Sequence, residues 1–167
     1  KIIDDDLIHV IAKRQPTASD LRLVMAISKM VTDLERSGDE VKKMAKSIRR
    51  IQERDVTVLK ATTDVRHLAD AASKQIRSAL DTFARLDVSE ASSIIDADEA
   101  LDTEFKAIVR QLITYMMEDP RSITTAMDII TIARAIERVG DHAKNIAEQV
   151  IYIVEGRDVR HMNSNDS

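Results

Sequence analysis

The hexapeptide LERSGD at residues 34–39 recurs as IERVGD at residues 136–141, 102 residues further along the chain. Each copy follows a proline-containing turn, at Pro16 and at Pro120. The similarity extends along both flanking segments, where matched positions carry the same or a similar residue: Ile27 with Ile129, Met30 with Ile132, Lys42 with Lys144, Met44 with Ile146, and Ala45 with Ala147. Self-similarity over such a distance indicates that a large structural unit has been duplicated.

Helical periodicity surrounds both copies. Apolar or small residues near the first copy recur at alternating steps of four and three, at Ile27, Val31, Leu34, Gly38, Val41, Ala45 and Ile48, which predicts the core-facing stripe of a helix. The chain has only three glycines, two prolines and 2% aromatic residues, too few for the turns and strands of a β-rich fold. The sequence therefore predicts an all-α fold.

Breaks in the periodicity predict five helices. The first is short, from about residue 7 to residue 14, and stops before Pro16, because proline disfavours the helical conformation of the residue before it. Thr17 or Ser19 is the expected cap of a second helix that ends between Arg49 and Asp55. The remaining helices are expected from about Val65 to near Asp87, from a Ser89 cap to Asp119, and from Ser122 to Glu155 with a left-handed C-cap at Gly156.

The repeat and the helices together suggest two tandem three-helix bundles. The second bundle is complete over residues 55–156, and residues 157–167 form a short polar tail. The first bundle, residues 1–54, lacks its opening helix. Because the sequence starts at Lys1 rather than at Met, we expect that the natural N-terminus precedes it.

Composition also narrows the function. The net charge of -4 argues against general nucleic-acid binding, which needs a basic surface. The chain has no cysteine, so it has no disulfide framework and no thiolate zinc site. The lack of cysteine also fits a reducing compartment, and we expect a cytoplasmic protein. No apolar run reaches the ~18 residues of a membrane-spanning helix. The sequence has no catalytic triad order and no phosphate-binding glycine loop, so we predict that it is not an enzyme.

Pairs of carboxylates spaced four residues apart are the candidate metal-binding groups of this chain. The spacing stacks two acids on one helix face, where like charges repel unless something neutralises them. Two antiparallel helices that each carry such a pair would gather four carboxylates, a donor set that suits hard and borderline cations. The pairs are Glu35 with Asp39, Asp98 with Asp102, and Glu137 with Asp141, and Asp4 is the surviving half of a fourth pair.

Two mid-helix glycines accompany these acids. Gly38 and Gly140 occupy equivalent positions in the two repeats, although each costs about 1 kcal/mol relative to Ala inside a helix. Close approach of a neighbouring helix, or room beside the carboxylates, would explain them.

A metal-free interpretation stays open at this point. Ordinary surface charge patterning also produces such acid pairs, and nearby bases could neutralise them: Arg36, Arg138, Lys42 and Lys144. Two alternatives to a regulator therefore remain, a purely structural bundle and a carboxylate-bridged metalloenzyme of the four-helix type. Such an enzyme needs histidines that face the acids. The Asp-x-x-His spacings at Asp6–His9, Asp64–His67 and Asp158–His161 lie on other segments and are more simply coincidental.

The chain resembles the PhoU family over nearly all its length, from about Asp4 to His161. The segments that carry the resemblance are residues 11–16 with 19–22, residues 34–39, residues 108–112 with 115–119, and residues 136–141. The family fold consists of two three-helix bundles related by duplication. Carried over by position, its acidic metal-binding motifs fall on Glu35 with Asp39, Asp98 with Asp102, and Glu137 with Asp141. Asp4 matches the last acid of a further motif, and Asn145 matches a recurrent polar position.

The resemblance also implies a function. Similar proteins are negative regulators of phosphate uptake and of the phosphate-starvation response. They act as adaptors between the ATPase of a phosphate ABC importer and a sensor histidine kinase, they bind transition metal ions such as iron, zinc or manganese, and they often form homodimers. On this basis we expect a homodimeric adaptor that associates with the membrane only through its partners.

Overall fold

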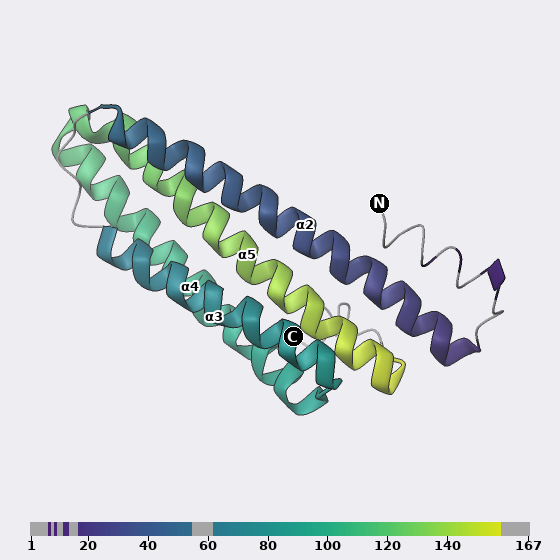
Figure 1. Ribbon diagram of the computed structural model, residues 1–167. Coiled ribbons are helices and arrows are strands. Elements are labelled where there is room, and N and C mark those ends of the chain that lie inside the picture. The colour runs from purple at the N-terminus through teal and green to yellow at the C-terminus, as the bar shows by residue number, and fades with distance from the viewer. Residues whose placement is uncertain (1–6, 8, 10–11, 14–16, 55–61, 158–167) are drawn as a thin grey trace.

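The computed structural model describes residues 7, 9, 12–13, 17–54 and 62–157 (Figure 1). Within these residues the chain forms no strand, and the all-α prediction is confirmed. The long helices of the described part are α2 (Ala18–Gln52), α3 (Thr62–Arg85), α4 (Val88–Glu118) and α5 (Ile123–Glu155), with a 3-10 turn, η1 (Pro120–Ser122), between α4 and α5. None of these helices is long and apolar enough to cross a bilayer.

Local capping chemistry sets the helix ends. The backbone N–H of Thr17 donates to Asp20 Oδ2 at 3.2 Å, which closes a capping box at the start of α2. Gly156 ends α5 with a left-handed φ of 71°, as predicted. The expected Ser89 cap of α4 is wrong. Asp87 caps this helix instead, because its carboxylate accepts a hydrogen bond from the Glu90 N–H at 3.1 Å.

Some predictions fall outside the described residues. These are Asp4, the proposed bundle boundary at Asp55, and most of the polar tail after Gly156. Of the short helix expected over residues 7–14, only Leu7, His9, Ala12 and Lys13 are described, and they are helical.

Helix α5 lies at the centre of the structure, between α2 on one side and the α3–α4 pair on the other (Figure 1). Its apolar stripe is buried against α3 and α4 in two clusters, one around Leu68 and Phe105 and the other around Ala79 and Ile94. The α4–η1–α5 hairpin runs antiparallel, which brings the start of α4 near the end of α5 and residues 98–102 beside residues 137–141.

The predicted core stripe of α2 is not buried. Ile27, Val31 and Leu34 are half-buried, and the later members are exposed, with exposed fractions of 53% at Val41 and 45% at Ile48. Their repeat equivalents on α5 are all buried: Ile129, Ala133, Ile136, Gly140, Ala143, Ala147 and Val150. The prediction is wrong for this helix because, of the described helices, only α5 packs against α2, and α2 turns a neighbouring face toward it.

That neighbouring face is polar. The side of α2 that meets α5 buries Asp33, Ser37, Glu40 and Ser47. Contacts between the two helices pair early residues of α2 with late residues of α5, such as Asp33 with His142, and late residues with early ones, such as Arg50 with Asp128. The helices are therefore antiparallel, and their interface depends on hydrogen bonds as well as on apolar contact.

Candidate metal centre

The second-repeat acids come together in one open pocket. Asp98 and Asp102 reach it from α4, and Glu137 and Asp141 reach it from α5. The pocket has a volume of about 410 Å³, and its other lining residues are Ile95, Asp96, Glu99 and Lys144. The antiparallel hairpin expected from the sequence thus places both carboxylate pairs around a single space, which we call the acidic pocket.

The charges in the acidic pocket repel one another. The pKa of Glu137 is raised, first by desolvation and then by the negative charges of Asp141 and Asp102. The pKa of Asp141 is raised by desolvation and by the charge of Asp98. Burial and neighbouring negative charge thus both disfavour the ionised forms of Glu137 and Asp141.

Basic side chains contact three of the four acids. Lys144 Nζ lies 3.0 Å from Asp98 Oδ2, and Lys106 Nζ lies 2.6 Å from Asp102 Oδ2. Arg134 Nη1 lies 3.3 Å from Glu137 Oε1, and its guanidinium also stacks on the Phe105 ring. Of the neutralising bases considered from the sequence, Lys144 acts as expected, whereas Arg138 reaches across to Glu40 on α2.

The donor chemistry of the acidic pocket fits a hard or borderline cation, because four carboxylates converge there. With side chains as they stand, no three Asp, Glu or His residues in the described part of the chain are arranged to hold a metal ion. Three of the four acids instead form ion pairs with lysine or arginine. A cation would therefore have to compete with these bases for the carboxylate oxygens.

Among the described residues, the first-repeat pair is not part of any acidic cluster able to hold a metal ion. Glu35 and Asp39 are exposed on α2, and the Asp39 carboxylate accepts a hydrogen bond from Lys42 at 2.8 Å. This contact lowers the pKa of Asp39. No described helix stands against this face, so a site at Glu35, Asp39 and Asp4 stays a prediction.

The two glycines have different surroundings. A Cβ at Gly140 would lie 3.2 Å from Leu101 Cδ1 and Cδ2 and 3.2 Å from Gln75 Oε1, so the expected close approach of neighbouring helices is confirmed there. At Gly38 a Cβ would meet no described atom within 4 Å, so the structure shows no close approach there, and room beside Glu35 and Asp39 stays a prediction. The difference reflects the α3–α4 pair, which covers α5 and does not cover α2.

Three buried carboxylates at the α2–α5 interface were not singled out from the sequence. Asp33 Oδ1 lies 2.8 Å from His142 Nδ1 and accepts a hydrogen bond from Asn145 at 3.1 Å. Glu40 pairs with Lys43 and with Arg138. The sequence does contain a pattern that indicates this buried polar face of α2. Polar residues recur at helical spacing beside the apolar stripe, at Asp33, Ser37, Glu40 and Ser47.

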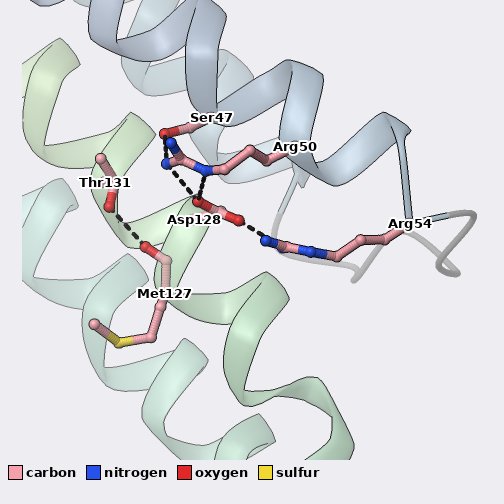
Figure 2. Close-up of polar contacts among 6 residues, drawn as sticks. All are labelled: Ser47, Arg50, Arg54, Met127, Asp128 and Thr131. Carbon is pink, nitrogen blue, oxygen red and sulfur yellow. Dashed lines mark hydrogen bonds and ion pairs between the residues drawn. The ribbon is translucent and has the colours of Figure 1, made fainter.

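The third carboxylate, Asp128, lies between two arginines (Figure 2). Its Oδ1 accepts from Arg50 Nε and Nη2 at 2.9 and 2.7 Å, and its Oδ2 accepts from Arg54 Nη1 at 2.6 Å. The same Arg50 Nη2 donates to Ser47 Oγ at 2.8 Å. This cluster joins the end of α2 to the start of α5.

The described histidines do not complete a di-metal carboxylate site. His142 follows Asp141 in the chain but points to Asp33 on α2, and His67 is exposed on α3. Neither lines the acidic pocket. Of the other two histidines, His9 is exposed and does not line the pocket, and His161 lies outside the described residues.

Without added metal, the double substitution Glu137→Gln with Asp141→Asn is expected to raise the melting temperature at pH 7. Both groups have raised pKa values in the folded protein, so the native state binds protons more tightly than the unfolded state. Ionisation therefore costs stability as the pH rises above about 4. In thermal melts from pH 3.5 to 7.5, the melting temperatures of wild type and the double variant should differ most at pH 7.5 and converge toward pH 3.5. A variant that is less stable than wild type at pH 7 would contradict this account.

A model of the PhoU domain matches residues 1–48 and 65–150. The phosphate-specific transport system accessory protein PhoU homolog of Pseudomonas putida is 48% identical over 160 residues, which are 96% of this chain and 62% of that protein. The homolog of Pseudomonas aeruginosa is also 48% identical over 160 residues, 96% of this chain and 66% of the relative. The chain thus spans slightly less than two thirds of the length of these two relatives. The Escherichia coli protein PhoU is 42% identical over 98% of this chain and 67% of its own length.

Solved structures agree with the sequence matches. The crystal structure of PhoU from Pseudomonas aeruginosa superposes with a TM-score of 0.89 at 46% identity, covering 92% of this chain and 73% of that one. The phosphate transport system regulatory protein PhoU from Streptococcus pneumoniae gives a TM-score of 0.82 at 27% identity, covering 92% of this chain and 71% of that one.

Proposed function

This chain belongs to the PhoU family, and we propose that it is a negative regulator of phosphate uptake and of phosphate-starvation signalling. In this role it is a cytoplasmic, homodimeric adaptor, not an enzyme, and it connects the ATPase of a phosphate ABC importer to a sensor histidine kinase. The supporting observation is the 48% identity, over 96% of the chain, to proteins named as accessory proteins of the phosphate-specific transport system.

The adaptor role is tested by binding to the two partners. The protein in its natural full length should be immobilised and exposed to the importer ATPase and to the sensor kinase, each purified, at high and at low phosphate. Saturable binding to both partners is expected. Failure to bind either one, at both phosphate concentrations, would reject the adaptor and leave the structural bundle as the better interpretation.

We further propose that the acidic pocket is the metal site of this regulator. The support is the convergence of Asp98, Asp102, Glu137 and Asp141 and the raised pKa values of the last two. A bound cation would supply the positive charge that these carboxylates lack. Asp98 and Glu137 would hold it from opposite helices, and Lys144, whose pKa is raised by its hydrogen bond to Asp98 despite desolvation, would have to release that oxygen.

Metal binding is expected to stabilise the fold. At a tenfold excess of metal over the dissociation constant, the gain in unfolding free energy is about 1.4 kcal/mol. Melts with added Mn²⁺, Fe²⁺ or Zn²⁺ should show this for wild type and not for the Glu137→Gln, Asp141→Asn variant. Elemental analysis of protein purified without chelator provides an independent measurement. Equal responses to metal in both proteins would exclude the acidic pocket as the site.

A further inference from the structure

A second pocket, distinct from the acidic pocket, lies between α2 and α5. It has a volume of about 310 Å³ and is lined by Lys29, Thr32, Asp33, Arg36, Asn145 and Gln149. The acidic pocket opens between α4 and α5 and shares none of these residues. We call the second one the basic pocket, because two cationic side chains face a single carboxylate there.

The carboxylate of the basic pocket is already engaged. Asp33 Oδ1 accepts a hydrogen bond from Asn145 Nδ2 at 3.1 Å and lies 2.8 Å from His142 Nδ1. Lys29 contacts only the face of the Tyr152 ring, at 5.6 Å from the centroid, and Arg36 has no hydrogen bond or ion pair within the described part of the chain. The pocket therefore retains an excess of positive charge.

The duplication explains why Arg36 is left without a carboxylate. Its repeat equivalent, Arg138, lies 3.4 Å from Glu40 across the α2–α5 interface. The residue equivalent to Glu40 in the second repeat is His142, which is directed at Asp33. The symmetric ion pair is thus absent at Arg36, where the basic pocket opens instead.

A buried amide in the basic pocket also lacks a partner. The exposed fraction of Gln149 is only 4%, and its Oε1 has no hydrogen-bond partner among the described residues. A buried amide end without a partner costs roughly 1–3 kcal/mol. The two ends of a primary amide have nearly the same shape, so the buried end can also be the NH₂ group, which donates to an anion. With the NH₂ group at this end, the amide can donate a hydrogen bond to an anion in the pocket.

From these observations we infer that the basic pocket is a binding site for a small oxyanion, a phosphate or carboxylate group held by Arg36, Lys29 and the Gln149 amide. Guanidinium and ammonium groups bind such anions through short charge-assisted hydrogen bonds. An oxyanion would neutralise the two cations and satisfy the buried amide. The site is independent of the acidic pocket and of the proposed adaptor function.

The test is an NMR titration of the side-chain amides of Asn145 and Gln149 with sodium phosphate, at constant ionic strength and without added metal. Wild type should show saturable shifts. Arg36→Gln should weaken binding at least about tenfold, because it removes a charge-assisted contact. Arg49→Gln, which removes another exposed arginine of α2 that does not line the pocket, should have no effect. Lys29→Gln provides a second test of the pocket charge.

Parallel titrations with other anions identify which kind of anion the pocket binds. Sulfate and acetate separate tetrahedral anions from carboxylates, and phosphoserine separates a protein-borne phosphate from the free ion. Chloride is the reference anion. If one of these oxyanions binds more tightly than chloride, and Arg36→Gln abolishes that binding, the result supports the site and identifies its ligand. If no oxyanion gives saturable shifts, or if Arg36→Gln and Arg49→Gln behave alike, the inference is wrong.

Discussion

Replacing Asp128 with Ala is expected to lower the free energy of unfolding by roughly 3 kcal/mol. Asp128 is buried, and its two oxygens accept three hydrogen bonds from Arg50 and Arg54. Its removal leaves two guanidinium groups facing each other at the junction of α2 and α5 (Figure 2). The side chain of Arg50 is 48% exposed, so solvation of the freed arginines keeps the loss near the lower end of the values for buried pairs.

The control for this prediction is Asp39→Ala. Asp39 also forms an ion pair, with Lys42 at 2.8 Å, but both side chains are exposed. Exposed pairs contribute little to stability, so the chemical denaturation midpoint of this variant should stay close to that of wild type. Equal losses in the two variants would show that Asp128 does not join the two helices.

The contribution of Asp128 should depend on pH in a defined direction. Burial alone would raise its pKa, but hydrogen bonds from Arg50 and Arg54 outweigh this effect and hold the pKa below its ordinary value. A lowered folded pKa stabilises the protein above the unfolded value of about 3.9, and the benefit is lost as the pH falls through the folded pKa. The stability difference between wild type and Asp128→Asn should therefore shrink below about pH 4.

The helices were predictable because their signals are local. Pro16, Pro120 and Gly156 mark breaks that backbone geometry enforces, and the repeat identified α5 as the partner of α2 in the duplication. The capping of α4 by Asp87 instead of Ser89 was missed because both residue types are good caps. The choice depends on the backbone conformation of the preceding turn, where Leu86 has a positive φ of 53°.

The sequence did not show which face of α2 would be buried against α5. Its apolar stripe satisfies the pattern of a core helix, yet the face that packs on α5 is polar, with Asp33 and Glu40 buried by partners about a hundred residues away. Hydrophobic periodicity reports which residues can be buried, and only the tertiary arrangement decides which face finds a neighbour. The acidic pocket was easier to anticipate, since an antiparallel hairpin with short connections fixes the register of α4 against α5.

The glycine pair provides a matched test of the packing asymmetry between the repeats. Gly140→Leu is expected to lower the free energy of unfolding by roughly 3 kcal/mol, because even its Cβ would lie 3.2 Å from Leu101, a buried residue at the contact of α4 with α5. Gly38→Leu should instead raise stability by up to roughly 0.8 kcal/mol, since a Cβ there meets nothing within 4 Å and leucine favours the helix. Chemical denaturation of both variants of this chain measures the difference. Similar destabilisation by the two substitutions would mean that the face of α2 around Gly38 is covered in solution, as its repeat equivalent on α5 is.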